Sequence, residues 1–192
     1  MTSQFNFFDE PEREHAVLEG FRYQRELISA REEQALLTHL RELPFRPFQF
    51  HGHQGKRRTV SFGWQYEFSC SGKLRKTEDI PEFLLPLRAL AASFAGLEPE
   101  AFQHALVIEY GPDAGIGWHR DKPVFGEVVG ISLLASCVLR FRRKVGAKWE
   151  RANVTAEPHS AYHLTGPARS EWQHSILSVD TLRYSITFRQ VL

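Results

Sequence analysis

Residues 183–189 read RYSITFR, and polar and apolar side chains alternate without a break through this stretch. Successive side chains of a β-strand point to opposite faces, so the polar residues would share one face and the apolar residues would face a core. The polar set is Arg183, Ser185, Thr187 and Arg189. A guanidinium can grip a carboxylate through two parallel hydrogen bonds, so this polar face suits a bound diacid better than it suits packing.

The chain from about residue 104 onward is predicted to be mainly β. Gly, Pro, Asp or Asn interrupts most of the gaps between short runs of strand-forming residues. Besides the last strand, these runs are Ala105–Tyr110, Val128–Leu134, Cys137–Arg142, Lys148–Val154, Ser160–Leu164 and Ser175–Val179. Many strands at close spacing, with no helix expected among them, predict a two-sheet β barrel or sandwich.

Two helices are expected ahead of these strands, where they would support one sheet. Ser29 and Glu32 have the spacing of a capping box, and leucines follow at helical intervals, which predicts a helix over about 30–42. A second helix is predicted from Pro81 to about Ala95, ended by Gly96 and disturbed near its middle by a proline. The segment between the two helices, about 45–77, is expected to be irregular strand and loop.

Length and composition favour one folded domain over residues 1–192. Hydrophobic residues make up 42% of the chain, which is enough for a core and excludes a disordered chain. The formal net charge is only +1, so it does not demand a nucleic-acid partner, although a local basic face is compatible with it. Cys70 and Cys137 are expected to be reduced. With no recognisable secretory signal or membrane span, we expect a cytoplasmic monomer with no membrane partner.

His119, Asp121 and His174 are candidate metal ligands. The first two are two residues apart and would project from the same face of a strand, whereas His174 must be brought to them by the fold. Two imidazoles and one carboxylate on one side of a metal leave three positions free for substrate and oxygen, which is the ligand set of non-heme Fe(II) oxygenases. The alternative is that the three are unrelated polar residues.

Four motifs together resemble those of AlkB-like Fe(II)/2-oxoglutarate dioxygenases. They are YGPDAGIGWHRD at 110–121, GISL at 130–133, GPARS at 166–170 followed by His174, and RYSITFRQ at 183–190. HxD alone is a poor signal, but HxD, a distal His and RxxxxxR in this order are far more specific. The resemblance implies an α+β, mainly β fold with a double-stranded β-helix core of the jelly-roll or cupin type.

The resemblance also implies where the cofactors bind. His119, Asp121 and His174 would hold Fe(II) and be the catalytic centre, with 2-oxoglutarate and O₂ as cosubstrates. Arg183 would pair with the distal carboxylate of 2-oxoglutarate, and Arg189 would lie near its keto-acid end or the metal-binding carboxylate. The helices and a substrate lid would occupy about 1–103, and the β core with the metal and cosubstrate site would occupy about 104–192.

Further cosubstrate and pocket contacts are implied by the same resemblance. Tyr110 matches a hydroxyl aimed at the cosubstrate, and Ser185 stands where the family often has Asn. Ile108 also replaces a frequent Asn and cannot form its hydrogen bond. Arg169 matches an arginine that lines the substrate pocket.

The segment KRRTVSFGWQY at 56–66 lies where the family places its substrate lid. Basic residues beside aromatic residues can grip phosphates and stack on bases. Arg58, Phe62, Trp64 and Tyr66 are therefore predicted to contact substrate. The alternative is a solvated basic turn that leads into a strand of buried aromatics. A second basic run, RFRRK at 140–144, would either touch nucleic acid or form a strand end with a solvated turn.

The resemblance favours oxidative demethylation of N-alkylated bases in DNA or RNA, as in alkylation repair, with a nucleic acid as partner. One alternative is the same oxygenase chemistry on a protein or small molecule. It is favoured by the balanced charge and by Pro123, which stands where several DNA-repair members carry an acidic residue. The other alternative is a non-catalytic binding module on the same fold, against which the intact ligand set argues.

Overall fold

The computed structural model describes residues 18–50, 53–66 and 74–192. Its core is two antiparallel sheets, a major sheet of seven strands and a minor sheet of four. The major sheet has the order β1 (Phe21–Gln24), β11 (Ala161–Leu164), β8 (Phe125–Leu133), β13 (Arg183–Val191), β6 (Phe102–Tyr110), β3 (His53–Phe62) and β2 (Arg46–Phe50). The minor sheet has the order β10 (Lys148–Ala156), β9 (Cys137–Val145), β12 (Gln173–Ile176) and β7 (Ile116–His119).

The chain passes repeatedly from one sheet to the other between β6 and β13, which is the pattern of a double-stranded β-helix. All seven strands expected from about residue 104 onward are present, with ends that differ by a few residues. The predicted mainly β fold with a jelly-roll core is confirmed. Between the two sheets lies an apolar core that includes Leu139, Phe141 and Trp172.

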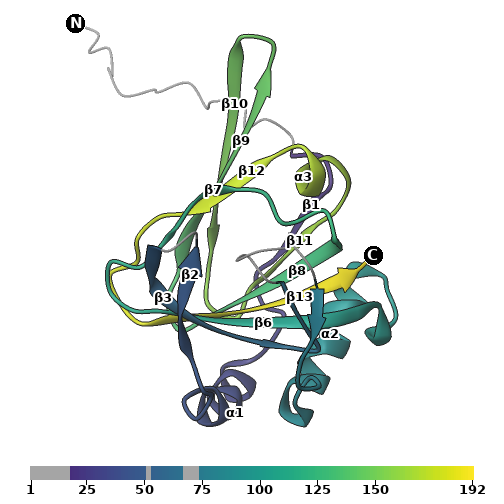
Figure 1. Cartoon of the computed structure of the whole chain (residues 1–192), viewed down its shortest axis with the longest axis vertical. Coiled ribbons are helices and arrows are strands. Elements are labelled where there is room, and N and C mark those ends of the chain that lie inside the picture. The colour runs from purple at the N-terminus through teal and green to yellow at the C-terminus, as the bar shows by residue number, and fades with distance from the viewer. Residues whose placement is uncertain (1–17, 51–52, 67–73) are drawn as a thin grey trace, which may run out of the picture.

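Two helices cover the outer face of the major sheet, at the end of the molecule opposite the β9–β10 hairpin (Figure 1). α1 (Ala30–Leu40) begins with the predicted capping box of Ser29 and Glu32, and α2 (Leu85–Ala95) ends at Gly96, whose φ is 76°. Leu40, Leu87 and Ile186 belong to one buried cluster that joins both helices to the sheet.

The beginning of α2 differs from the expectation. A 3₁₀ turn, η1 (Glu82–Leu84), precedes it, and a second one, η2 (Pro99–Ala101), follows it. Pro86 lies in the first turn of α2, where its missing N–H is not needed for a helical hydrogen bond. The predicted helix is therefore divided next to Pro86, and its α-helical part begins later than expected.

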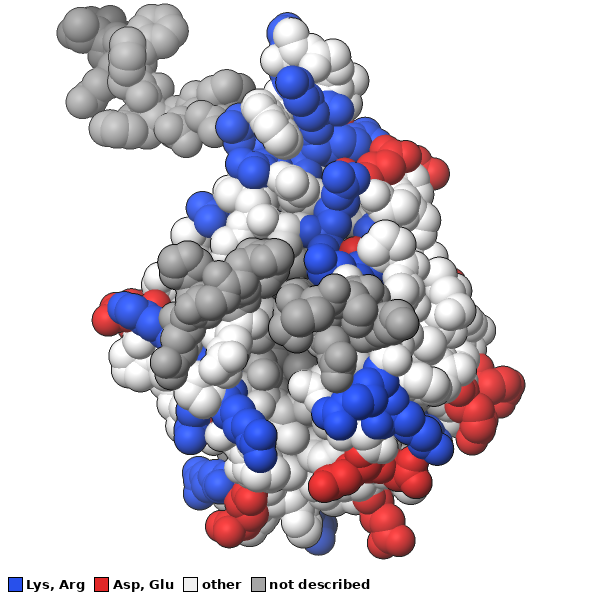
Figure 2. All heavy atoms as spheres, in the orientation of Figure 1, with Lys and Arg blue, Asp and Glu red and all other residues white. Residues whose placement is uncertain are grey.

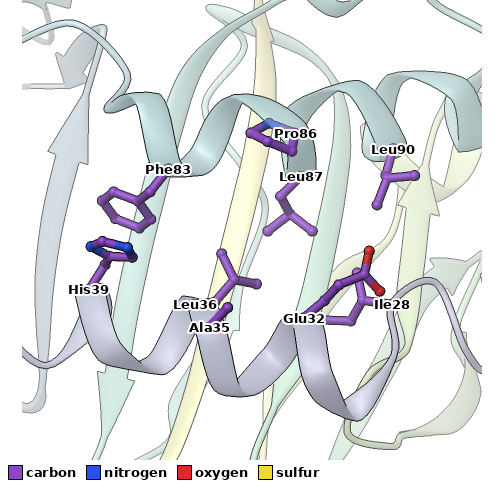
Figure 3. Close-up of a pocket in the computed structure, with 9 residues that line it drawn as sticks. All are labelled: Ile28, Glu32, Ala35, Leu36, His39, Phe83, Pro86, Leu87 and Leu90. Carbon is purple, nitrogen blue, oxygen red and sulfur yellow. The ribbon is translucent and has the colours of Figure 1, made fainter.

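The groove between α1 and α2 is apolar, and Leu36, Phe83, Leu87 and Leu90 line it (Figure 3). His39 stacks on Phe83 with ring centroids 4.8 Å apart and closes one end of the groove.

Two other expectations about secondary structure were wrong. The segment 45–77 is more regular than expected, because β2 and β3 extend the major sheet and β4 (Trp64–Tyr66) pairs with β5 (Leu74–Lys76) in a hairpin. Pairing of β3 with β6 fixes this segment as strand, and no local pattern reveals that pairing. A short helix, α3 (Gly166–Ser170), also interrupts the late strands, with Pro167 in its first turn.

Cys137 is a buried free cysteine, and burial raises the pKa of its thiol. Cys70 lies outside the described residues. Among the described residues, the helices are too short or too polar to cross a membrane.

Gly130 of β8 allows a close approach inside the major sheet. A Cβ atom at this position would lie 2.2 Å from Cζ of Tyr162, whose ring covers the glycine from β11. Tyr162 is buried between the two sheets, so it has little room to retreat.

The first prediction concerns this contact. Gly130→Ala should lower the free energy of unfolding by about 1–3 kcal/mol, because overpacking forces a buried side chain from its position. Gly111→Ala is the matched control, since a Cβ there meets nothing within 4 Å. Denaturant unfolding of both variants measures the effect, and equal stabilities would contradict the packing described here.

Candidate metal centre

His119, Asp121 and His174 converge between the two sheets, and their ligand atoms lie within 4.8 Å of one another. His119 ends β7 and is paired directly with His174 of β12, so the two rings are 4.2 Å apart. Asp121 lies just beyond β7, not on it as expected, and its Oδ2 is 3.8 Å from Nε2 of His174. Two imidazoles and a carboxylate gathered in this way could hold a divalent metal such as Fe(II).

The backbone orients His119 for a metal. Its Nδ1 lies 2.9 Å from the carbonyl oxygen of Gly117. A carbonyl only accepts hydrogen bonds, so Nδ1 carries the hydrogen and donates it, and Nε2 keeps its lone pair. Hydrogen bonds of this kind fix the tautomer and ring orientation of metal-binding histidines.

The charges around the triad favour the protonation states that a metal requires. Burial alone would raise the pKa of Asp121, but the positive charge of Arg189 and the nearby histidines outweigh it and hold that pKa well below its ordinary value. Burial, followed by repulsion from His119, lowers the pKa of His174 to about 3. At neutral pH the carboxylate is ionised and the imidazole of His174 is neutral, as metal ligation demands.

Arg189 lies on the major sheet and contacts the triad directly. Its Nη2 lies 3.2 Å from Oδ1 of Asp121, and both side chains are about nine-tenths buried. Arg189 therefore lies beside the carboxylate of Asp121, which is one of the two positions expected for it. The ion pair leaves the second oxygen, Oδ2, on the side of His174.

Arg183 is fully buried at the other end of the polar face of β13. Its Nε and Nη2 lie 3.2 and 3.0 Å from Oγ of Ser132, and its Nη1 has no hydrogen-bond partner among the described residues. The guanidinium lies 4.8 Å from the ring centroid of Tyr110, whose buried hydroxyl also lacks a partner among these residues. A buried cation without a counter-charge is costly, so the site fits an anionic ligand such as a carboxylate.

A small cavity joins these groups. The triad, Tyr110, Ser185, Thr187 and Arg189 line it together with apolar residues from both sheets. Of the predicted cosubstrate contacts, the structure brings Tyr110, Ser185 and Arg189 to this cavity, with Arg183 stacked behind Tyr110. Thr187 also lines this cavity, as its place on the polar face of residues 183–189 predicts. Ser132 belongs to the same region through its contacts with Arg183, although the sequence assigned no role to it. Ser132 lies inside the GISL motif, which was the available signal.

Two of the predicted substrate contacts, Arg58 and Phe62, lie on the side of the major sheet opposite the cavity. Arg58 pairs with Glu109 across β3 and β6, with Nε 2.6 Å from Oε1, and Tyr184 donates to the same carboxylate at 3.0 Å. This group lies on the helix side of the sheet. Phe62 is also on that side and is buried in the core beneath the helices. The positions of Arg58 and Phe62 contradict their predicted role, because the pairing of β3 with β6 turns both away from the metal.

Arg57 precedes Arg58 and was not predicted to contact substrate, but its side chain lies on the cavity side of the major sheet. It is two residues before Thr59, which is paired with the cavity-lining Ile108. Its guanidinium lies 3.8 Å from the ring centroid of Phe48, and its Nη1 is 3.4 Å from the carbonyl oxygen of Gly115. Burial is the main influence that lowers the pKa of His119, and the charge of Arg57 acts in the same direction. Only the register of β3 on β6 distinguishes Arg57 from Arg58.

Arg169 shapes the site from α3 instead of facing a substrate. Its guanidinium donates to the carbonyl oxygens of Asp121, Lys122, Phe125 and Gly126. These contacts hold the loop that follows Asp121. The structure thus shows the predicted pocket-lining arginine engaged with the backbone.

The β4–β5 hairpin carries the other two predicted substrate contacts. Tyr66 lies beside the loop after Asp121, with Nζ of Lys122 5.2 Å from its ring centroid. Trp64 pairs with Lys76 and is half-buried. Neither aromatic residue lines the cavity itself.

Comparisons with known proteins agree with this arrangement. A family model described as the 2OG-Fe(II) oxygenase superfamily matches residues 20–189. A solved structure described as OsALKBH1 aligns with a TM-score of 0.71 at 15% identity and covers 89% of this chain and 96% of that one. A 2OG-Fe(II) oxygenase family oxidoreductase from Burkholderia pseudomallei aligns with a TM-score of 0.61 at 15% identity and covers 90% and 85% of the two chains. At this identity the two structures show a shared fold.

The second prediction concerns metal binding. His174→Ala should abolish the stabilisation that Mn(II), used as an unreactive substitute for Fe(II), gives to the folded protein. At a hundred times the dissociation constant, a ligand stabilises the native state by about 2.7 kcal/mol. The melting temperature with and without Mn(II) measures this gain. His39→Ala, which removes a histidine from the helix groove, should keep the full gain, and an equal gain in both variants would exclude His174 as a ligand.

Proposed function

The chain belongs to the 2OG-Fe(II) oxygenase superfamily, and we propose that it oxidatively removes methyl groups from nitrogen atoms of nucleic-acid bases. It is a 2-oxoglutarate-dependent non-heme iron dioxygenase, and its cofactors are Fe(II), 2-oxoglutarate and O₂. The candidate ligand set of His119, Asp121 and His174 is complete, which argues against a non-catalytic binding module on the same fold.

The residues present fit the iron and the cosubstrate. The triad would hold Fe(II), and the unpaired Nη1 of Arg183 would receive the distal carboxylate of 2-oxoglutarate. The hydroxyl of Tyr110, which lacks a partner among the described residues, could donate a further hydrogen bond to such a diacid. Arg189 would keep Asp121 ionised and oriented while the metal is bound.

When bound, these cofactors supply the oxidising power that converts a C–H bond to C–OH, while 2-oxoglutarate is converted to succinate and CO₂. A hydroxylated carbon on nitrogen breaks down to formaldehyde and the free N–H. The chain's own residues hold the reactants and exclude water. Ile108, Val128 and Ile176 form apolar walls of the cavity, so competing reactions with solvent are suppressed.

Cation–aromatic pairs on segments next to the cavity support a nucleic acid as the substrate. Arg57 lies over Phe48 on the β2–β3 side, and Lys122 lies over Tyr66 on the β4–β5 side. Such pairs suit a ligand that combines negative phosphates with flat bases. The two cation–aromatic pairs, next to a cavity lined by the candidate metal ligands, are the observation that carries the proposal.

A protein or small molecule is the second candidate substrate. Arg58 and Phe62 lie on the helix side of the major sheet, which removes two of the predicted contacts to a nucleic acid. Pro123 offers no side-chain hydrogen bond to a base at a position where several repair members have an acid. The chemistry at the metal would be the same in either case.

The third prediction tests the substrate. The Fe(II)-loaded protein with 2-oxoglutarate and O₂ should release formaldehyde from oligonucleotides that carry N-methylated bases, in DNA, RNA or both. Formaldehyde and succinate should appear in equal amounts, and Asp121→Ala should produce neither, because it removes a metal ligand. Succinate formation with methylated peptides or nucleosides, and none with any methylated oligonucleotide, would support the second candidate instead.

The fourth prediction tests the cosubstrate site. Arg183→Gln should raise the KM for 2-oxoglutarate roughly 10- to 100-fold, because a hydrogen bond to a charged group is worth about 1.5–3 kcal/mol. Steady-state turnover at varied 2-oxoglutarate measures the change. Arg58→Gln, an arginine on the helix side of the same sheet, should leave this KM unaltered. A KM that rises equally in both variants would place the diacid elsewhere.

A further inference from the structure

The outer face of the minor sheet carries a group of arginines and tryptophans on the side opposite the metal triad. On β9, Leu139 and Phe141 point into the core between the sheets, so the residues that alternate with them point outward. The register of β9 with β10 and β12 extends this outward set across the sheet. We call the following residues the outer platform: Trp118, Arg140, Arg142, Lys144, Trp149 and Arg151.

Arginine and indole groups alternate on the outer platform. The guanidinium of Arg142 lies between two indoles, 4.4 Å from the ring of Trp118 and 4.7 Å from the ring of Trp149. The guanidinium of Arg140 lies 4.9 Å from the ring of Trp118. Stacking of this kind holds the planar cations in a fixed orientation.

The partners of these arginines are neutral. Nε of Arg140 donates to Oγ of Ser175 at 3.0 Å, and Nε of Arg142 donates to Oε1 of Gln173 at 2.8 Å. Each bond uses one edge of a guanidinium and leaves its positive charge uncompensated.

The two acidic residues near the β9–β10 hairpin, Glu150 and Glu171, form ion pairs on the side of the hairpin opposite the outer platform. Arg143 points away from the outer platform and pairs with Glu150 at 2.9 Å and Glu171 at 2.7 Å. Among the described residues, no ion pair involves an arginine or the lysine of the outer platform. The outward positions of β9, β10 and β12 include no acidic residue.

The clustering of arginines and exposed indoles on the outer platform does not help to stabilise the sheet. Arg142 and Arg151 lie directly opposite each other on β9 and β10, and like charges at such positions are destabilising. Trp149 is 41% exposed, so much of its apolar surface remains in water. Clustered cations with interleaved aromatic rings are the surface that a flexible polyanion with flat bases would cover.

We propose that the outer platform binds single-stranded nucleic acid next to the nucleotide that enters the metal site. The proposal rests on the proposed function for its substrate class. Phosphates would meet Arg140, Arg142 and Arg151, and a base would stack on the exposed indole of Trp149. An acidic peptide would match the charges but would make no use of the indoles.

The position of the outer platform supports this role. Trp118 immediately precedes the candidate ligand His119 on β7, which is the edge strand of the minor sheet. Because β7 is an edge strand, a nucleic-acid strand that passes around it would reach the metal site on one face of the minor sheet and the outer platform on the other. In Figure 2, Lys and Arg atoms form a column from the tip of the molecule that carries the β9–β10 hairpin toward the middle of the visible face.

Fluorescence anisotropy with the full chain and a labelled, unmodified single-stranded oligonucleotide tests the outer platform. Arg142→Gln/Arg151→Gln should weaken binding at least about 10-fold near 0.1 M salt. It should also reduce the slope of log affinity against log salt by about 1.4, since each phosphate contact to a single strand contributes about 0.7. Trp149→Ala should weaken binding roughly 5-fold or more with the slope unaltered, because it removes a stacking contact.

Arg25→Gln/Arg31→Gln is the matched control, because it removes the same charge from exposed positions before and within α1. It should lose far less affinity than the variant of the outer platform. If the double variant of the outer platform fails to fold, Arg151→Gln alone carries the test, since Arg151 is exposed.

Three results would overturn the proposal. The first is an equal loss of affinity in the control. The second is an unaltered affinity in both variants of the outer platform. The third is polyglutamate binding that is as tight as oligonucleotide binding and depends equally on Trp149, which would indicate an acidic protein as the partner.

Turnover separates this proposal from the proposed function. Binding that depends on the outer platform, without formaldehyde from any methylated oligonucleotide, would support the surface and contradict the proposed function. Demethylation of long oligonucleotides that is unaffected by Arg142→Gln/Arg151→Gln would support the proposed function and overturn the outer platform. If both are correct, these substitutions should raise the KM for long oligonucleotides and leave turnover of a methylated trinucleotide unaltered.

Discussion

The buried ion pair between Asp121 and Arg189 joins the two halves of the site. Asp121 follows the edge strand of the minor sheet, and Arg189 belongs to a central strand of the major sheet. Two charged groups in a dry interior are tolerated only when they compensate each other, so this contact fixes how the sheets face one another at the metal centre. Arg169 adds to the constraint by binding the backbone of the loop after Asp121.

The two faces of the major sheet differ, because one packs beneath the helices and the other lines the cavity. Its helix side holds Tyr184, Ile186 and Phe188 in the core beneath α1 and α2. Its other side presents polar residues of the same strand, β13, toward the cavity and the triad. Strand alternation therefore lets one segment pack against the helices and also present the residues proposed to bind the cosubstrate. The minor sheet repeats this division, with the candidate metal ligands on its inner face and the outer platform on its outer face.

The sequence predicted the features that depend on local pattern. Alternation in residues 183–189 placed Arg183 and Arg189 on one face, and the spacing of Ser29 and Glu32 located the start of α1. Features that depend on pairing between distant strands were not predictable. Whether Arg57 or Arg58 lies on the cavity side of the major sheet is decided by the register of β3 on β6, and no property of either residue reveals it. Likewise, Arg169 contacts carbonyl groups that only the folded loop brings together.

The most direct test of the central claim is an anaerobic titration of the protein with Fe(II) and 2-oxoglutarate, followed by visible absorption. A metal held by His119, Asp121 and His174, with a keto-diacid directed by Arg183, should give a charge-transfer band that saturates at one Fe(II) per chain. The band should be absent from Asp121→Ala under the same conditions. A folded wild-type protein that gives no band, or an Asp121→Ala variant that gives the wild-type band, would contradict this account.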